Sequence, residues 1–153
     1  MRGIVFLKNG GLKMKKFITF LLISMAALSG NAYADANTDF QTAVSEGNLD
    51  NAMKALKAGA KNVNAVDATG QTALHYAVAK GDFQSVLALA KGGANATARD
   101  THYKRTVVDL AISQLAQIGQ GLMNNPQDAT MQQQAVIYTQ ILHIVYSIQF
   151  KVV

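Results

Sequence analysis

Hydrophobic residues recur at helical spacing in the middle and at the end of the chain. The central stripe is formed by Phe83, Val86, Leu87, Leu89 and Ala90. The C-terminal stripe is formed by Val136, Ile137, Ile141, Leu142, Val145 and Ile148. This spacing is typical of helices that bury one face against a core. We therefore expect a helix at each place and expect the ring of Phe83 to be buried.

The chain also repeats itself at a regular interval. Gly47 and Gly81 are 34 residues apart, and so are Gly59 and Gly93. A repeat of this length indicates stacked units that bury their apolar surfaces only against one another. Three such units are visible in the sequence.

The middle unit predicts a turn followed by two helices. Gly70 belongs to a turn-forming stretch that begins at Asp67, and Thr72 is suited to cap the first helix. Gly81 breaks that helix, and Gly93 is suited to end the second helix in a left-handed conformation. Each unit is therefore expected to be a turn and a helical hairpin.

The turn and first helix carry a specific resemblance. Residues 67–77, with the sequence DATGQTALHYA, resemble the signature D-x-x-G-x-T-P-L-H-x-A of the ankyrin-repeat family, with Ala73 in place of the proline. The resemblance implies that His75 hydrogen-bonds the neighbouring turn backbone. It also implies an all-α solenoid of about three helix-turn-helix units with a long helical C-terminal cap. The units are expected at about 37–66, 67–99 and 100–150, within a domain of residues 35–153.

The third unit departs from this pattern. The residues that replace the turn glycine, the histidine and the inter-helix glycine are Tyr103-Lys104-Arg105, Asp109 and Leu115. Without an inter-helix glycine, the first helix should continue from about Val107 to about Met123, and Pro126 then prevents it from continuing. A final helix over about 129–150 should then fold back as the cap. The alternative is that this helix docks on a partner or on a second copy.

Residues 14–34 have the pattern of a secretory signal peptide. Two lysines precede the apolar run from Phe17 to Leu28, and small residues end the segment. Cleavage between Ala34 and Asp35 is expected. The protein is then expected to be exported, and to be periplasmic if its source is a Gram-negative bacterium.

The apolar run is too short for a membrane anchor, because 12 residues make about 18 Å of helix against a hydrocarbon core of about 30 Å. No membrane association is expected after cleavage. Residues 1–13 lie outside the signal pattern, and Met14 provides a better start. We interpret residues 1–13 as a misassigned start of translation.

Charge and cysteine content narrow the possible functions. The whole chain has a net charge of +5, but five of its 14 basic residues lie in residues 1–34, which contain no acidic residue. The expected mature protein thus has nine basic and nine acidic side chains. A neutral domain lacks the broad basic surface that nucleic-acid binding needs. The absence of cysteine excludes disulfides and thiolate chemistry.

The candidate binding residues gather around the turn of the third unit. Arginine and tyrosine are enriched at the hot spots of protein interfaces. The turn segment therefore indicates a surface that binds another protein, although a solvated turn would have the same composition. The residues assigned to this surface are Lys80, Arg99, His102, Tyr103, Lys104 and Arg105.

No catalytic or cofactor motif accompanies them. The sequence lacks a nucleophile elbow, a phosphate-binding glycine loop and histidines spaced as metal ligands. We expect a non-enzymatic module, without cofactor or metal, that binds another protein through its inter-repeat turns and the inward face of its first helices. The sequence does not identify the partner. Two alternatives stay open. One is an accessory protein that hands haem or a metal to an exported enzyme through His75, His102 or Tyr103, and the other is a toxin-neutralising immunity protein.

Overall fold

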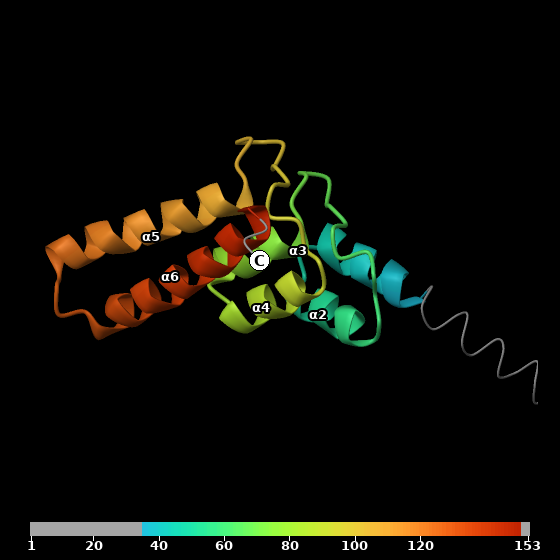
Figure 1. Ribbon diagram of the computed structural model, residues 1–153, viewed down its shortest axis with the longest axis horizontal. Helices are drawn as coiled ribbons and strands as arrows, with labels where there is room; N and C mark the ends of the chain where they lie inside the picture. The colour runs from blue at the N-terminus through green and yellow to red at the C-terminus, as the bar shows by residue number, and fades with distance from the viewer. Residues whose placement is uncertain (1–34, 151–153) are drawn as a thin grey trace, which may run out of the picture. The chain divides into compact units, whose positions relative to one another are not determined.

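The computed structural model describes residues 35–150, in which helices account for most of the chain. The expectations for residues 1–13, for the signal peptide and for Ala34 lie outside the described residues. A first helix covers residues 35–45. The later helices are α2 (Leu49–Lys57), α3 (Ala73–Lys80), α4 (Phe83–Lys91), α5 (Val107–Asn124) and α6 (Ala129–Phe150) (Figure 1).

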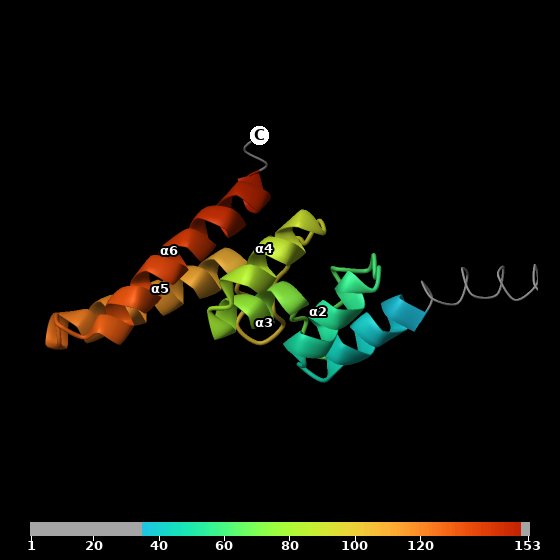
Figure 2. The same ribbon diagram turned by 90° about the horizontal axis from the view of Figure 1, so that it is seen from below.

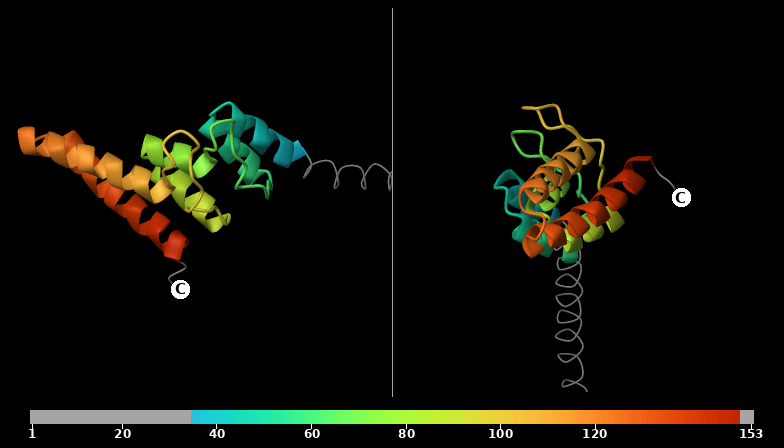
Figure 3. Two further views of the ribbon diagram at one scale, coloured as in Figure 1. Left: turned by 90° about the horizontal axis from the view of Figure 1, so that it is seen from above. Right: turned by 90° about the vertical axis from the view of Figure 1, so that its left-hand side faces the viewer.

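These helices form three stacked hairpins, so the expected all-α repeat fold is confirmed. Helix 35–45 pairs with α2, α3 with α4, and α5 with α6 (Figures 1 and 2). The two long loops that join the hairpins project to the same side (Figure 3). Each loop is closed by one antiparallel bridge, between Val66 and Thr72 and between Arg99 and Thr106.

One continuous core runs through the stack. Small residues on the first helices, Ala73, Ala77 and Ala111, are at most 1% exposed and let neighbouring hairpins approach closely. Larger side chains then fill the space between the layers. The most completely buried of these are Phe40, Val44, Leu49, Leu74, Val78, Val86, Leu89, Val107, Ile141 and Val145.

Phe83 lies outside this set, so the expectation that its ring is buried is wrong. On α4 the inward positions are taken by Val86 and Leu89, which are fully buried. Phe83 starts the helix and is only partly buried, beside Ile144 of α6. Its ring covers an edge of the core.

The last two helices form the long hairpin that the sequence predicted. Helix α5 begins at Val107 and ends at Asn124, one residue beyond the expected end. Helix α6 packs along α5 and also against α4. Near the loop between them, Gly121 leaves room for the Met131 side chain, because a Cβ at that glycine would lie 2.6 Å from the sulfur. Among residues 35–150, no helix combines the length and apolarity needed to cross a bilayer.

The inter-helix glycines of the first two units are each covered by a tyrosine ring. Gly47 and Gly81 have φ values of +65° and +67°, which favour glycine. A Cβ at Gly47 would lie 3.3 Å from the ring of Tyr76, and one at Gly81 would lie 3.3 Å from the ring of Tyr138. The same contact therefore joins each hairpin to the next one.

Tyr138 was missed by the sequence pattern. It comes from α6, whereas Tyr76 comes from the first helix of its own unit, so the repeat does not relate them. Tyr138 is buried, and its hydroxyl donates to the carbonyl of Ala79 at 3.3 Å. Val136, which was expected on the buried stripe, is 59% exposed. The buried face of α6 instead follows Tyr138, Ile141 and Val145.

Candidate protein-binding surface

The turn of the middle unit is organised by Asp67. One oxygen of its carboxylate accepts hydrogen bonds from the N–H groups of Thr69 and Gln71, at 2.7 and 2.9 Å, and the other accepts one from the hydroxyl of Tyr76. Burial and the hydrogen bond to Asp67 raise the pKa of Tyr76 to about 12. Both oxygens of the Asp67 carboxylate are therefore hydrogen-bonded within the middle unit.

Gly70 occupies the tip of this turn with φ of +74°. A Cβ there would lie 3.0 Å from the methyl group of Thr101 and 3.2 Å from the carbonyl oxygen of Arg99. The two turns are in direct contact, since the N–H and the hydroxyl of Thr101 both donate to the carbonyl of Thr69 at 2.8 and 2.9 Å. Neighbouring turns therefore form one connected surface.

Thr72 and His75 fix the start of α3. The N–H of Thr72 donates to Nδ1 of His75 at 3.1 Å, so a neutral ring carries its proton on Nε2. His75 is 1% exposed, and its Nε2 is buried without a well-formed hydrogen bond. Burial lowers the pKa of His75, and the main chain of Arg105 and the charge of Asp100 offset only part of this effect. The ring thus serves as a neutral structural group.

A buried neutral histidine predicts that stability falls in mild acid. The unfolded ring binds a proton below about pH 6.5, whereas the folded ring resists protonation until a lower pH. The free energy of unfolding should therefore decrease as the pH drops below about 6.5, and should stop decreasing from this cause below the folded pKa. Urea titrations at several pH values would measure this. The variant His75→Gln should be less stable at neutral pH and lose the dependence between about pH 6.5 and 5, above the range in which the carboxylates titrate. A slope that persists in this window would contradict the assignment.

The second turn contains the residues predicted to bind a partner. Arg105 pairs with the buried carboxylate of Asp100 at 3.5 Å, and its guanidinium lies 4.3 Å from the centre of the Tyr103 ring. His102 meets the same ring edge-on, with centroids 4.2 Å apart. Arg99 closes the turn by donating to the carbonyl of Lys104 at 2.6 Å.

Asp100 is the anchor that sequence reasoning missed. It is 5% exposed and also accepts a hydrogen bond from the N–H of Tyr103. Burial alone would raise the pKa of Asp100, but the hydrogen bond from Tyr103 and the charge of Arg105 lower it below its usual value. The signal was present in the sequence, because Asp100 stands one repeat after Asp67.

Lys104 takes the role of the missing turn glycine. Its φ of 56° corresponds to that of Gly70 in the preceding turn. The left-handed conformation costs a residue with a side chain about 1 to 2 kcal/mol. The sequence predicted a departure at this place, and the structure shows that the turn shape is kept by a strained lysine.

Relief of this strain should stabilise the protein. We expect Lys104→Gly to raise the free energy of unfolding by about 1 kcal/mol, which urea denaturation would measure. The matched control is Lys104→Ala, which removes the charge and keeps the strain, and should change stability little. Equal effects of the two variants would show that charge, and not backbone strain, governs this position.

The six predicted binding residues are only partly brought together. Arg99, His102, Tyr103, Lys104 and Arg105 share one turn. Lys80 is the last residue of α3 and thus lies one helix length, about 12 Å, from the turn end of that helix. It instead lines a groove of about 400 Å³ with Gln114, Gln134 and Tyr138. Gly93, predicted to end α4, has φ of +87° one residue after the helix cap.

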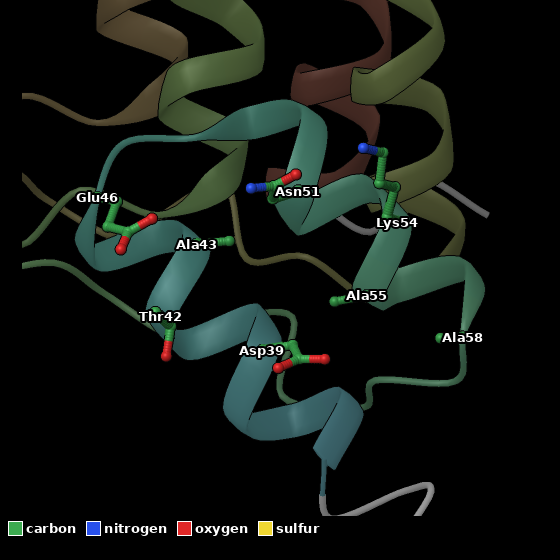
Figure 4. A pocket seen from close by; sticks show the side chains of 8 residues that line it. All are labelled: Asp39, Thr42, Ala43, Glu46, Asn51, Lys54, Ala55 and Ala58. Atoms are coloured by element: carbon green, nitrogen blue, oxygen red, sulfur yellow. The ribbon is translucent and has the colours of Figure 1, made fainter.

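A second groove lies on the outer face of the first hairpin (Figure 4). It has a volume of about 350 Å³ and runs between helix 35–45 and α2. Its lining mixes alanines with both signs of charge: Asp39, Thr42, Ala43, Glu46, Asn51, Lys54, Ala55 and Ala58. Within residues 35–150, no three side chains of histidine, cysteine, aspartate or glutamate gather as metal ligands.

Comparison with known families agrees with this architecture. A family model described as ankyrin repeats (3 copies) matches residues 12–100 and 40–135, and these matches together cover more than half of the chain. No curated protein sequence matches this chain. Ankyrin repeats generally mediate protein–protein interaction and are typically not enzymes. The chain belongs to the ankyrin-repeat family.

Proposed function

We propose that this chain acts after export as a non-enzymatic module that binds another protein through its inter-repeat turns and the inward face of its first helices. The observation that carries the proposal is the state of Tyr103. Its side chain is 63% exposed, yet it is held between the His102 ring and the Arg105 guanidinium.

A held aromatic side chain favours binding for a physical reason. Association costs the conformational freedom of the side chains that it immobilises, and a ring that is already fixed avoids most of this cost. The Arg105 side chain that contacts the Tyr103 ring is itself anchored, because it is paired with the buried Asp100. A merely solvated turn would not need this arrangement.

The electrostatics of the turn also support recognition of a partner. Asp67 and Asp100 direct their carboxylates to groups of their own turns. Among the described residues, Arg99 and Lys104 are exposed and have no carboxylate within ion-pair distance. The free charges at the tip are therefore positive, beside an exposed aromatic ring. Such a surface suits a protein segment with apolar and acidic groups.

The proposal predicts a specific loss of binding. The processed protein, whose expected first residue is Asp35, would be used to capture its partner from the exported fraction of its source. Tyr103→Ala should weaken the affinity for that purified partner at least about 30-fold, as expected when a hot-spot aromatic is removed. Calorimetric titration would measure the affinity.

The matched control is Met123→Ala. Met123 is 84% exposed near the far end of α5, so its loss removes an apolar side chain at least as accessible as that of Tyr103, outside the turns. This control should bind with unchanged affinity. A partner that tolerates Tyr103→Ala but not the control would show that another surface is used.

A further inference from the structure

The groove that contains Lys80 is built by three helices. It exists because α5 continues beyond the end of α3, while the middle hairpin turns back at Gly81. Its volume is about 400 Å³. The side chains that line it are Lys80 from α3, Gln114 and Ile118 from α5, and Gln134, Ile137 and Tyr138 from α6. We call this site the Lys80 groove.

Of the residues that line this groove in the described structure, Lys80 is the one with a charge. Its side chain is exposed, and no carboxylate within residues 35–150 lies within ion-pair distance of it. The carboxylate of Asp82 accepts hydrogen bonds from the N–H and the hydroxyl of Ser85, at 3.1 and 2.6 Å. Lys80 acts on Asp82 only as a more distant charge. The groove therefore offers a positive charge without a direct partner.

Two glutamine amides add hydrogen-bonding capacity. Gln114 is half-buried and Gln134 is exposed, and within residues 35–150 neither side-chain amide has a hydrogen-bond partner. Each amide provides two N–H donors and a carbonyl acceptor. The hydroxyl of Tyr138 already donates to the carbonyl of Ala79. The free polar groups of the groove are thus one ammonium and two amides, from three different helices.

The end of α3 is closed in a way that permits an anion nearby. A helix C-terminus has a partial negative charge because its last carbonyls lack partners within the helix. Here the N–H groups of Gly81 and Asp82 donate to the carbonyls of Val78 and Ala77, each at 3.0 Å, and Tyr138 covers that of Ala79. These bonds reduce the repulsion. One ammonium then balances a carboxylate, whereas a phosphate would favour arginine.

Two isoleucines give the groove an apolar wall. Ile118 is 9% exposed, and Ile137 is partly buried against the core. Both are held in place by the packing of α5 and α6. An aliphatic group placed against this wall would lose contact with water, which favours binding. The groove therefore combines an anion site with a small apolar surface.

We propose that the Lys80 groove binds the C-terminal carboxylate of a polypeptide that ends in an aliphatic residue. The carboxylate oxygens accept hydrogen bonds from the ammonium of Lys80 and from the amide N–H groups of Gln114 and Gln134. A glutamine carbonyl accepts from the last peptide N–H. The terminal side chain packs against Ile118 and Ile137.

A terminal carboxylate fits this lining better than the side chain of aspartate or glutamate. Its neighbouring carbon carries both an aliphatic side chain and an amide N–H, so one residue supplies all three groups that the groove can bind. An acidic side chain has no aliphatic branch beside its carboxylate. The Lys80 groove is separate from the turn of Tyr103, and the inference does not rest on that turn.

Nuclear magnetic resonance titration of the processed protein with short peptides tests the proposal. The probe is the acetylated tripeptide alanine-alanine-valine with a free C-terminal carboxylate. It should shift the side-chain amide signals of Gln114 and Gln134. The same tripeptide with a C-terminal amide, and acetylated alanine-glutamate-alanine amide, should each bind at least about tenfold more weakly. No shift at these glutamines with about 10 mM probe, or equal binding of either amidated peptide, would overturn the proposal.

Acetylvaline separates a polypeptide from a small free acid with the same chemistry. It has the carboxylate, the amide N–H and the aliphatic side chain, but no further backbone. For a polypeptide ligand, the tripeptide should bind at least about threefold more tightly than acetylvaline. Equal affinities would overturn the assignment to a polypeptide and indicate a small N-acylated amino acid.

Lys80→Gln tests whether the ammonium meets the carboxylate. This change should weaken binding of the free-carboxylate probe about tenfold, and should hardly affect the amidated probe, because the two changes remove the same interaction. Equal weakening of both probes would overturn the contact. The matched control is Lys91→Gln, because Lys91 is the last residue of α4 and lies outside the groove lining. It should bind both probes as the parent protein does.

Gln114→Glu places a carboxylate inside the groove and should abolish binding of the free-carboxylate probe by repulsion. Its control is Gln120→Glu, which adds the same charge on α5 about 200° around the helix from Ile118 and should leave binding unchanged. Circular dichroism would verify the folding of both variants. Unchanged binding by Gln114→Glu would overturn the proposal. Tyr103→Ala should not affect the probe, so binding through the turns and binding in the groove are tested separately.

Discussion

Leu89→Ala should lower the free energy of unfolding by about 2 to 5 kcal/mol, the usual cost of truncating a buried leucine. Leu89 is fully buried on α4, in the middle hairpin. Each hairpin of a solenoid is stabilised only by its neighbours, so a weakened middle hairpin loosens both outer ones. Urea denaturation at low protein concentration would measure the loss as one cooperative transition.

Phe83→Ala is the informative comparison on the same helix. Although the ring is larger than a leucine side chain, it is only partly buried at the edge of the groove between α4 and α6. We expect a smaller loss, of about 1 to 2 kcal/mol. A larger loss for Phe83→Ala than for Leu89→Ala would show that the ring belongs to the core after all.

The parts of the fold that could be predicted are those with a local cause. Gly70 marks a turn because its backbone conformation is costly for other residues, and Thr72 marks a helix start because its side chain can cap it. The long α5 followed from the absence of a glycine near Leu115. In each case a few neighbouring residues determine the backbone, so the sequence pattern is sufficient.

Contacts between distant segments could not be predicted in the same way. Tyr138 covers Gly81 although the two residues belong to different units, and no periodicity links their positions. The face of α6 that is buried depends on how α4 and α5 hold it. The helix has no charged residue, and its uncharged polar residues are mixed with apolar ones, so the pattern leaves that face undetermined. Val136 was assigned to the wrong face for this reason.

The candidate site also contains features that follow from neighbouring residues and features that depend on the fold. The five residues from Arg99 to Arg105 that were expected to act together do share one turn, because they are close in sequence. Lys80 was grouped with them by family pattern alone, and the fold places it at the opposite end of α3. The buried Asp100 was missed although it stands one repeat after Asp67, because the repeat alone does not show its burial or its ion pair with Arg105.

Truncation after Asn125, which removes α6, should abolish cooperative folding. This helix contributes the buried side chains of Tyr138, Ile141 and Val145. At about 1.5 to 3 kcal/mol for each buried apolar side chain, their loss is comparable to the entire stability of a small domain, about 5 to 15 kcal/mol. Near-ultraviolet circular dichroism and binding of a hydrophobic dye would detect the resulting molten state. A truncation after Phe150 should remain folded and serves as the control.

Hydrogen exchange on the intact chain separates a cap from a helix that only docks. If α6 is a cap, its amides over residues 136–148 should exchange slowly even in dilute monomeric protein, because α4 and α5 hold it in place. Fast exchange there, together with a cooperatively folded truncated protein, would mean that α6 is ordered only by a partner. The two faces of the helix make a combined role physically consistent, since the Ile141 side covers the core while the His143 side stays exposed. Slow exchange that does not depend on protein concentration would therefore establish the cap.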